Sequence, residues 1–143
     1  MQLPDINLLV YAHRADSPRH KEAQTWLETA LSSEEAVALT GSVLSGFVRV
    51  VTNSAAFRTP TPLGEALEFA RFLREEAGTT WLSPGDTHWS LFDRICRGAR
   101  VTGNLVPDAF LAALALEHGC EIVTFDRDFA RFKGLKWMVP EGA

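Results

Sequence analysis

The chain has 143 residues, of which 46% are hydrophobic and 22% are charged, and its formal net charge is -4. This length and composition are enough for one compact domain with its own core, and they exclude an intrinsically disordered chain. The longest apolar run, residues 109–116, is far shorter than the roughly 20 residues that a membrane-spanning helix needs. The net negative charge gives no overall attraction to nucleic acid, so any RNA contact must come from a local patch. We therefore expect one soluble domain over residues 1–143.

The first residues indicate a cytoplasmic location. The chain opens with Met1-Gln2-Leu3-Pro4-Asp5, so a carboxylate occurs almost at once. A secretory signal peptide would instead show a basic segment, then an apolar segment, then small residues. The opening lacks this pattern, and we expect the protein to stay in the cytoplasm.

The cysteines and histidines do not form a recognisable zinc or disulfide pattern. Cys96 and Cys120 lie far apart in sequence, without a CxxC pair or a paired histidine spacing. We expect both to be buried as small hydrophobic residues. The four histidines likewise form no convincing ligand set.

Apolar periodicity predicts alternating short strands and helices along the whole chain, without a linker or an internal repeat. A short strand over residues 2–4 leads into a helix over residues 6–13. Ser17, followed by a proline, has the pattern of an N-cap and predicts a second helix that ends near Leu31. Residues 36–40 read as the next strand.

The middle of the chain repeats this alternation. Residues 42–52 keep their apolar side chains on one helical stripe and predict a third helix. Thr61, again followed by a proline, predicts the start of a helix over residues 63–77, which Gly78 can end in a left-handed conformation. The β-rich run at residues 79–82 predicts a third strand.

The last part of the chain contains the most apolar helix. Asp86 is predicted to cap a helix that reaches about Arg97, and a further helix over residues 105–118 can be closed by Gly119. The remaining elements are a buried strand over 120–125, a short helix over 126–132 and a last strand over 135–139. About five strands separated by helices predict an α/β fold in three α/β/α layers, with a mostly parallel central sheet.

Four aspartates stand where α/β proteins bind ligands, at the carboxyl ends of strands and the starts of helices. Asp5 ends the first strand, Asp126 and Asp128 follow the fourth, and Asp108 lies in the first turn of the apolar helix. Each could simply be a helix cap or a first-turn carboxylate, which contributes roughly 0.3 to 2 kcal/mol. Converging carboxylates would instead need a divalent cation, and oxygen ligands favour Mg²⁺ or Mn²⁺ over zinc. The residues alone are consistent both with four structural aspartates at helix starts and with a metal site.

Three segments resemble the motifs of VapC-type PIN domains, the ribonuclease toxins of bacterial toxin–antitoxin pairs. The segments are Pro4-Asp5-Ile6-Asn7, Gly103-Asn104-Leu105-Val106-Pro107-Asp108-Ala109 and Thr124-Phe125-Asp126-Arg127-Asp128-Phe129. Their order and spacing extend the resemblance over almost the whole chain. It implies a PIN-like fold and a Mg²⁺- or Mn²⁺-dependent endoribonuclease that cuts tRNA or rRNA. It also implies a homodimer that a VapB-type antitoxin neutralises.

The same resemblance implies roles for individual residues. Carried over by position, Asp5, Asp108 and Asp126 are the metal-binding acids, and Asp128 joins them as an additional catalytic acid. The supporting polar residues implied by the motifs are Asn7, Asn104 and Thr124. Their hydrogen bonds would orient the carboxylates or bound water, and such partners affect metal affinity or activity by roughly tenfold to a hundredfold.

Gly46 departs from the family pattern. Family members usually carry Glu, Phe, any residue and Arg in the third helix, whereas this chain reads Gly46-Phe47-Val48-Arg49. A mid-helix glycine is less favourable than alanine by about 1 kcal/mol, so it indicates either close backbone packing or tolerated loss of the acid. Two hypotheses follow. The protein is an active nuclease with three or four acids, or a degenerate domain that binds RNA or antitoxin without cutting.

Two groups of basic residues are candidates for RNA contact. The first comprises Arg94, Arg97 and Arg100, and the second comprises Arg127, Arg131, Lys133 and Lys136. Of these, Arg94, Arg97, Arg127 and Arg131 are the RNA-binding candidates. The alternative is a solvated face, because basic residues near a helix C-terminus are favoured by the helix dipole.

Overall fold

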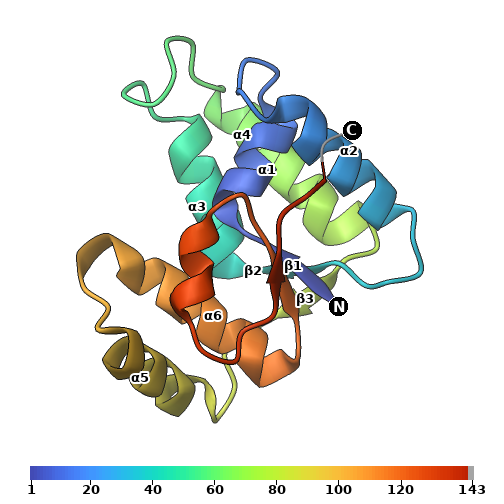
Figure 1. Cartoon of the computed structure of the whole chain (residues 1–143). Coiled ribbons are helices and arrows are strands. Elements are labelled where there is room, and N and C mark those ends of the chain that lie inside the picture. The colour runs from blue at the N-terminus through green and yellow to red at the C-terminus, as the bar shows by residue number, and fades with distance from the viewer. Residues whose placement is uncertain (142–143) are drawn as a thin grey trace.

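The computed structural model describes residues 1–141 (Figure 1). The strands are β1 (Gln2–Pro4), β2 (Ala38–Thr40), β3 (Thr80–Leu82), β4 (Glu121–Val123) and β5 (Trp137–Met138). The α-helices are α1 (Ile6–His13), α2 (His20–Leu31), α3 (Gly41–Val51), α4 (Leu63–Arg71), α5 (His88–Ala99) and α6 (Val106–His118). Shorter helical turns are the π-helix η1 (Phe72–Glu76) and the 3₁₀-helices η2 (Gly103–Leu105) and η3 (Arg127–Arg131).

All strand pairs are parallel, which confirms the predicted α/β fold class. The strands form a three-stranded sheet in the order β1-β4-β5 and a two-stranded sheet of β2 and β3. A single parallel bridge between Gln2 and Val37 joins the two sheets beside β1. The predicted single sheet is therefore divided into two sheets. Because the bridge places β2 beside β1, β1 lies between β2 on one side and β4 on the other. Its carboxyl end, which leads into Asp5, is surrounded by other elements.

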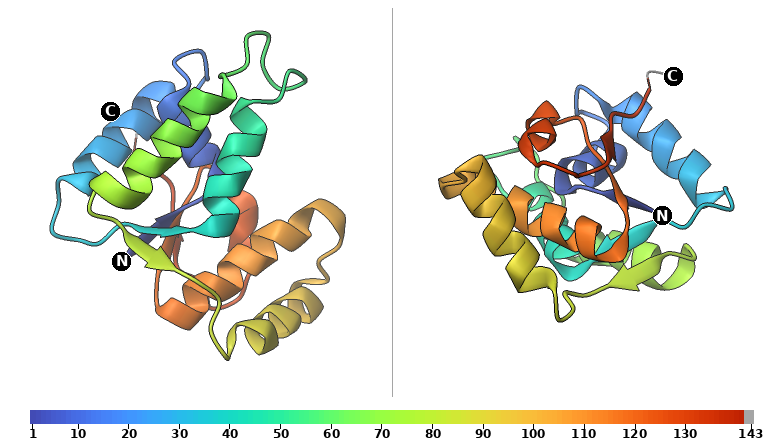
Figure 2. Two further views of the ribbon diagram at one scale, coloured as in Figure 1. Left: turned by 180° about the vertical axis from the view of Figure 1, so that it is seen from behind. Right: turned by 60° about the horizontal axis from the view of Figure 1, so that its bottom comes forward.

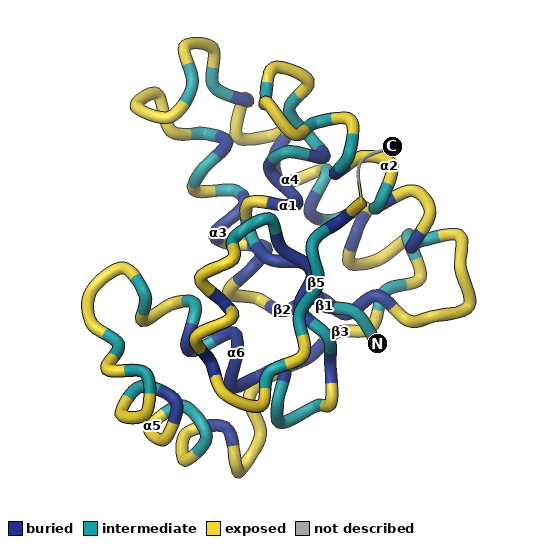
Figure 3. The backbone as a smooth tube through the Cα atoms, in the orientation of Figure 1, coloured by how far each residue is buried: buried dark blue, intermediate teal, exposed yellow. Residues whose placement is uncertain are grey.

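The helices lie in two groups on different sides of the strands. One group is the pair α5 and α6, and the other contains α1 to α4 (Figures 1 and 2). The helix α6 is fully buried from Ala112 to Ala115, because small alanines let it pack closely against its neighbours (Figure 3). Within residues 1–141, no helix combines the length and the apolar character that crossing a membrane requires.

Two predicted caps, Ser17 and Thr61, are wrong, because both side chains turn towards the Arg14 region instead. The Ser17 hydroxyl donates to the Arg14 carbonyl at 2.7 Å, and α2 begins only at His20. The Thr61 hydroxyl accepts a hydrogen bond from the Arg14 guanidinium at 3.2 Å, and α4 begins at Leu63 without a side-chain cap. A tertiary contact therefore replaces the predicted cap at Thr61, and a local bond to a carbonyl three residues back replaces it at Ser17.

The predicted cap of α5, Asp86, is also wrong. The helix begins at His88, and its preceding turn is held by Glu117 of α6. The Glu117 carboxylate accepts hydrogen bonds from the Gly85 amide at 2.7 Å, the Thr87 amide at 3.1 Å and the Thr87 hydroxyl at 2.9 Å. A residue of α6 thus holds the turn that precedes α5 and fixes this turn against α6.

Candidate active site

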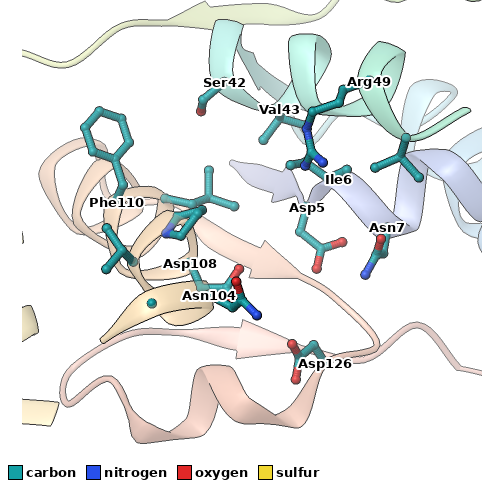
Figure 4. A pocket seen from close by; sticks show the side chains of 15 residues that line it. Asp5, Ile6, Asn7, Ser42, Val43, Arg49, Asn104, Asp108, Phe110 and Asp126 are labelled. Atoms are coloured by element: carbon teal, nitrogen blue, oxygen red, sulfur yellow. The ribbon is translucent and has the colours of Figure 1, made fainter. Parts of the chain in front are cut away.

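A cavity of about 600 Å³ lies at the carboxyl end of β1, between α3 and the start of α6. Its lining includes Asp5, Asp108 and Asp126, the three acids predicted to bind metal. Asn7 and Asn104 line it as well, and Figure 4 shows these five side chains around one space. Segments more than a hundred residues apart in sequence thus meet at one point, as the parallel topology requires.

Asp5 is held by hydrogen bonds from two directions. One carboxylate oxygen accepts from the Leu8 amide at 2.9 Å, so Asp5 caps α1, and the other accepts from the Thr124 hydroxyl. Thr124 is fully buried, and its hydroxyl oxygen also accepts from the Asp126 amide at 2.9 Å. Thr124 therefore connects Asp5 to the segment that carries Asp126, which agrees with the supporting role that the motif implies.

The two buried or half-buried acids have raised pKa values. Burial raises the pKa of Asp5 from 3.8 to about 6, against the lowering effect of the hydrogen bonds from Thr124 and Leu8. Burial, and after it the negative charges of Asp126, Asp5 and Asp128, together raise the pKa of Asp108 to about 6. Arg131 opposes this shift only weakly. The cavity is thus an electronegative space that favours a bound cation or proton.

Asp128 lies next to the cavity but does not line it. Its amide donates to the Asp126 carboxylate at 2.8 Å, which caps η3, while its own side chain is exposed. Its carboxylate lies 3.5 Å from the Arg131 guanidinium. Its charge still reaches the site, because it contributes to the raised pKa of Asp108.

The residues present fit a hydrated divalent cation in charge and in donor type. Oxygen donors from Asp5, Asp108 and Asp126 face the same space, and the cavity has room for several water molecules. Within the described residues 1–141, no three acidic, histidine or cysteine side chains are close enough to form a complete ligand set. Mg²⁺ commonly keeps several waters and binds through only one or two carboxylates, so a complete protein cage is not required.

Two lining residues from α3, Ser42 and Arg49, were not among the predicted site residues. Both line the cavity, and the Arg49 side chain extends over it from α3 (Figure 4). Arg49 forms no ion pair with any residue in the described range. The signal that could have found them is their spacing, because positions 42, 46 and 49 share one helical face.

Gly46 packs directly against Ile6, the residue between Asp5 and Asn7. A Cβ atom added at Gly46 would lie 2.3 Å from Ile6 Cδ1 and 2.8 Å from Ile6 Cγ1. Neither distance is compatible with ordinary packing, so the glycine permits the close approach of the two residues. Of the two explanations open from sequence, close packing is therefore present, and Ile6 fills the space beside this helix position.

The raised pKa values predict that the metal-free protein loses stability as pH rises. A carboxyl with a pKa of about 6 in the folded state and 3.8 when unfolded binds protons more tightly when folded. Its destabilising effect is absent below pH 3.8 and complete above about pH 6. In EDTA, we expect these two carboxyls to lower the thermal unfolding midpoint as pH rises from 3.8 to about 6, and the fall to be smaller in Asp108→Asn. Circular dichroism melts would measure this, and an equal pH dependence in both proteins would contradict it.

Comparisons with known proteins agree with these observations. The model of the PIN domain family matches residues 3–135. Ribonuclease VapC25 of Mycobacterium tuberculosis is 36% identical over 140 residues, which cover 98% of this chain and 99% of the relative. Ribonuclease VapC43 of the same species is 40% identical over 136 residues, which cover 95% of this chain and 92% of the relative.

Solved structures show the same fold at lower sequence identity. A chain of VapBC2 from Rickettsia felis bound to a promoter DNA fragment superposes with a TM-score of 0.70, at 14% identity and with 96% and 97% coverage. M. tuberculosis VapC20, described as a sarcin–ricin loop cleaving toxin, superposes with a TM-score of 0.66, at 17% identity and with 91% and 93% coverage. The fold, the sequence matches and the acidic cavity agree, and the chain belongs to the PIN-domain family, among the VapC ribonucleases.

Proposed function

We propose that this protein is a Mg²⁺- or Mn²⁺-dependent endoribonuclease, the toxin of a type II toxin–antitoxin system. The observation that carries the proposal is the convergence of Asp5, Asp108 and Asp126 on one cavity, where the negative charge of Asp126 raises the pKa of both Asp5 and Asp108. Relatives named ribonucleases, at 36% and 40% identity over nearly the full chain, support it. We propose tRNA or rRNA in the cytoplasm as the substrate.

In the proposed reaction, a water molecule attacks the phosphorus and the bond to the 3′ oxygen breaks. The products are a 5′-phosphate and a 3′-hydroxyl, which takes up the proton. A metal ion held by Asp5, Asp108 and Asp126, in part through bound water, would lower the pKa of the attacking water and balance the charge on the phosphate.

The chain's own residues position this chemistry. Thr124 and the Leu8 amide fix both oxygens of Asp5, so that carboxylate is oriented before any ligand arrives. The amides of Asn7 and Asn104 face the cavity and can hydrogen-bond water or a phosphate oxygen. Arg49, which extends over the cavity, can bind a phosphate oxygen of the same RNA.

Partners are part of the same proposal. We propose that a VapB-type antitoxin neutralises the protein and that it forms a homodimer. Structural neighbours solved as toxin–antitoxin complexes, such as VapBC-1 from nontypeable Haemophilus influenzae, support an antitoxin partner. The second candidate function is a degenerate domain that binds RNA or antitoxin without cutting, and glycine at position 46 favours it.

Metal-dependent cleavage distinguishes the two candidates. We expect purified protein to cut labelled tRNA and rRNA fragments into discrete products with Mg²⁺ or Mn²⁺. Cleavage should stop in EDTA and return when excess metal is added, because the cation neutralises the acidic cavity. Denaturing gels would show the products. If no metal supports cleavage while labelled RNA still binds, the degenerate function replaces the nuclease.

A further inference from the structure

A second cavity is lined by residues from both of the basic groups identified in the sequence. It has a volume of about 380 Å³ and lies between α5 and the end of η3 with the residues that follow. Its lining comes from Arg94, Ile95, Gly98 and Ala99 of α5, and from Arg131 and Lys133. We call this cavity the basic hollow. Its three cationic side chains come from two distant segments of a chain whose net charge is -4.

The cations of the basic hollow are largely available to a ligand. Arg94 and Lys133 are exposed, and neither forms an ion pair with a residue of the described range 1–141. Arg131 is only partly available to a ligand, because its guanidinium lies 3.5 Å from the Asp128 carboxylate. Gly98 has open space where a side chain would project. The basic hollow therefore presents positively charged side chains around the open surface at Gly98, and this arrangement suits an anion.

The helix η3 connects the basic hollow to the acidic cavity. Asp126, which caps its start, lines the acidic cavity, while its last residue, Arg131, lines the basic hollow. A 3₁₀-helix of this length rises roughly 10 Å, so the two sites lie within a short stretch of one RNA strand. The charge of Arg131 also acts on Asp108, which is consistent with this proximity.

We propose that the basic hollow binds a backbone phosphate of the RNA substrate, next to the phosphate that the acidic cavity cuts. The inference rests on the proposed nuclease function. Arg94 and Lys133 hold the phosphate from opposite sides, and Arg131 faces it from the end of η3. RNA is favoured over an acidic peptide because the hollow lies one short 3₁₀-helix away from the cavity that is proposed to cut a phosphodiester.

The test measures binding of labelled single-stranded RNA of mixed sequence in EDTA, at several salt concentrations, by fluorescence anisotropy. We expect Arg94→Ala and Lys133→Ala each to weaken binding roughly three- to tenfold. Each should also reduce the slope of log affinity against log salt by about 0.7, and the double variant should reduce it by about twice that. Arg131 is left intact, because it also contacts Asp128.

Two controls define the site. Lys21→Ala removes one exposed charge from α2, at the other side of the molecule, and should leave the salt slope unchanged (Figure 1). Arg97 lies on α5 but outside the hollow, where Asp93 accepts from it at 3.0 Å, so Arg97→Ala should have a smaller effect than Arg94→Ala. Equal effects of Arg94→Ala and Arg97→Ala would mean that α5 attracts RNA as a whole, and the proposal would be wrong.

A parallel titration with labelled poly-glutamate separates RNA from an acidic peptide. Loss of poly-glutamate affinity in Arg94→Ala and Lys133→Ala, with RNA affinity intact, would overturn the proposal. Because binding is measured without metal, it does not depend on cleavage. Weakened RNA binding in these variants supports the hollow even if the wild type never cuts. Cleavage by the wild type with unchanged binding in the variants refutes the hollow and leaves the nuclease function standing.

Discussion

Replacing Asp108 by asparagine is expected to slow metal-dependent RNA cleavage by about a hundredfold or more, while the protein stays folded. Asparagine keeps the shape of the side chain but removes a charge that the cation needs. The same substitution removes a repelled, half-buried carboxylate, so stability in EDTA at pH 7 should not fall. Initial rates of fragment formation at saturating Mg²⁺ would measure the first effect, and thermal melts the second.

Asp5→Asn should cause a similar loss of cleavage, because it also removes a negative charge from the cavity. The fold should be kept, because the amide oxygen of the new side chain can still accept from Leu8 and cap α1. Asp86→Asn is the matched control, because it removes one exposed carboxylate outside the cavity and should cleave like the wild type. A rate for Asp108→Asn equal to that of Asp86→Asn would show that the cavity does not use this acid.

Restoring the family's glutamate at position 46 is expected to destabilise the protein. Any side chain there meets Ile6, whose Cδ1 atom would lie 2.3 Å from the new Cβ. Overpacking of this kind costs about 1 to 3 kcal/mol, which exceeds the gain of up to about 1 kcal/mol from removing a helical glycine. Gly46→Glu should therefore melt at a lower temperature. In the double variant Ile6→Ala/Gly46→Glu, the contact is relieved, and half-maximal cleavage should need less Mg²⁺.

The chain offers a matched control for this effect. Gly64 in α4 has no atom within 4 Å of the position of an added Cβ. Gly64→Ala should raise the free energy of unfolding by up to about 1 kcal/mol, whereas Gly46→Ala should lower it. Urea titrations would compare the two variants. Stabilisation by both substitutions would show that Ile6 moves aside easily, and the missing acid would then have no packing explanation.

The sequence predicted most elements of the fold because their signals are local. The N-cap of α1, Asp5, contacts an amide only three residues ahead, and Gly119 closes α6 in the left-handed conformation that glycine favours. The start of α5 could not be predicted in this way. The turn before it is held by Glu117, about thirty residues along the chain, and only the packing of α5 on α6 brings Glu117 there.

The same distinction applies to the site. The acids could be predicted from short motifs at strand ends, and the structure places three of them around one cavity. The direction of Arg49 depends on how α3 packs, and the meeting of Arg94 with Lys133 depends on how α5 lies against η3. The reason for a glycine at position 46 is its contact with a single neighbour, Ile6, whose position no local pattern specifies.

The parallel pairing of β1 with β4 has a consequence for the order of events during protein synthesis. Asp5 is made well before the Thr124 hydroxyl that orients it, which lies 119 residues further along the chain. A growing chain that still lacks β4 has no partner for that side of β1 and no Asp126 to complete the cavity. For the proposed nuclease, the unfinished chain is therefore harmless. The ribosome and tRNAs that make the protein are exposed to its activity only after β4 and the segment that carries Asp126 have emerged and folded.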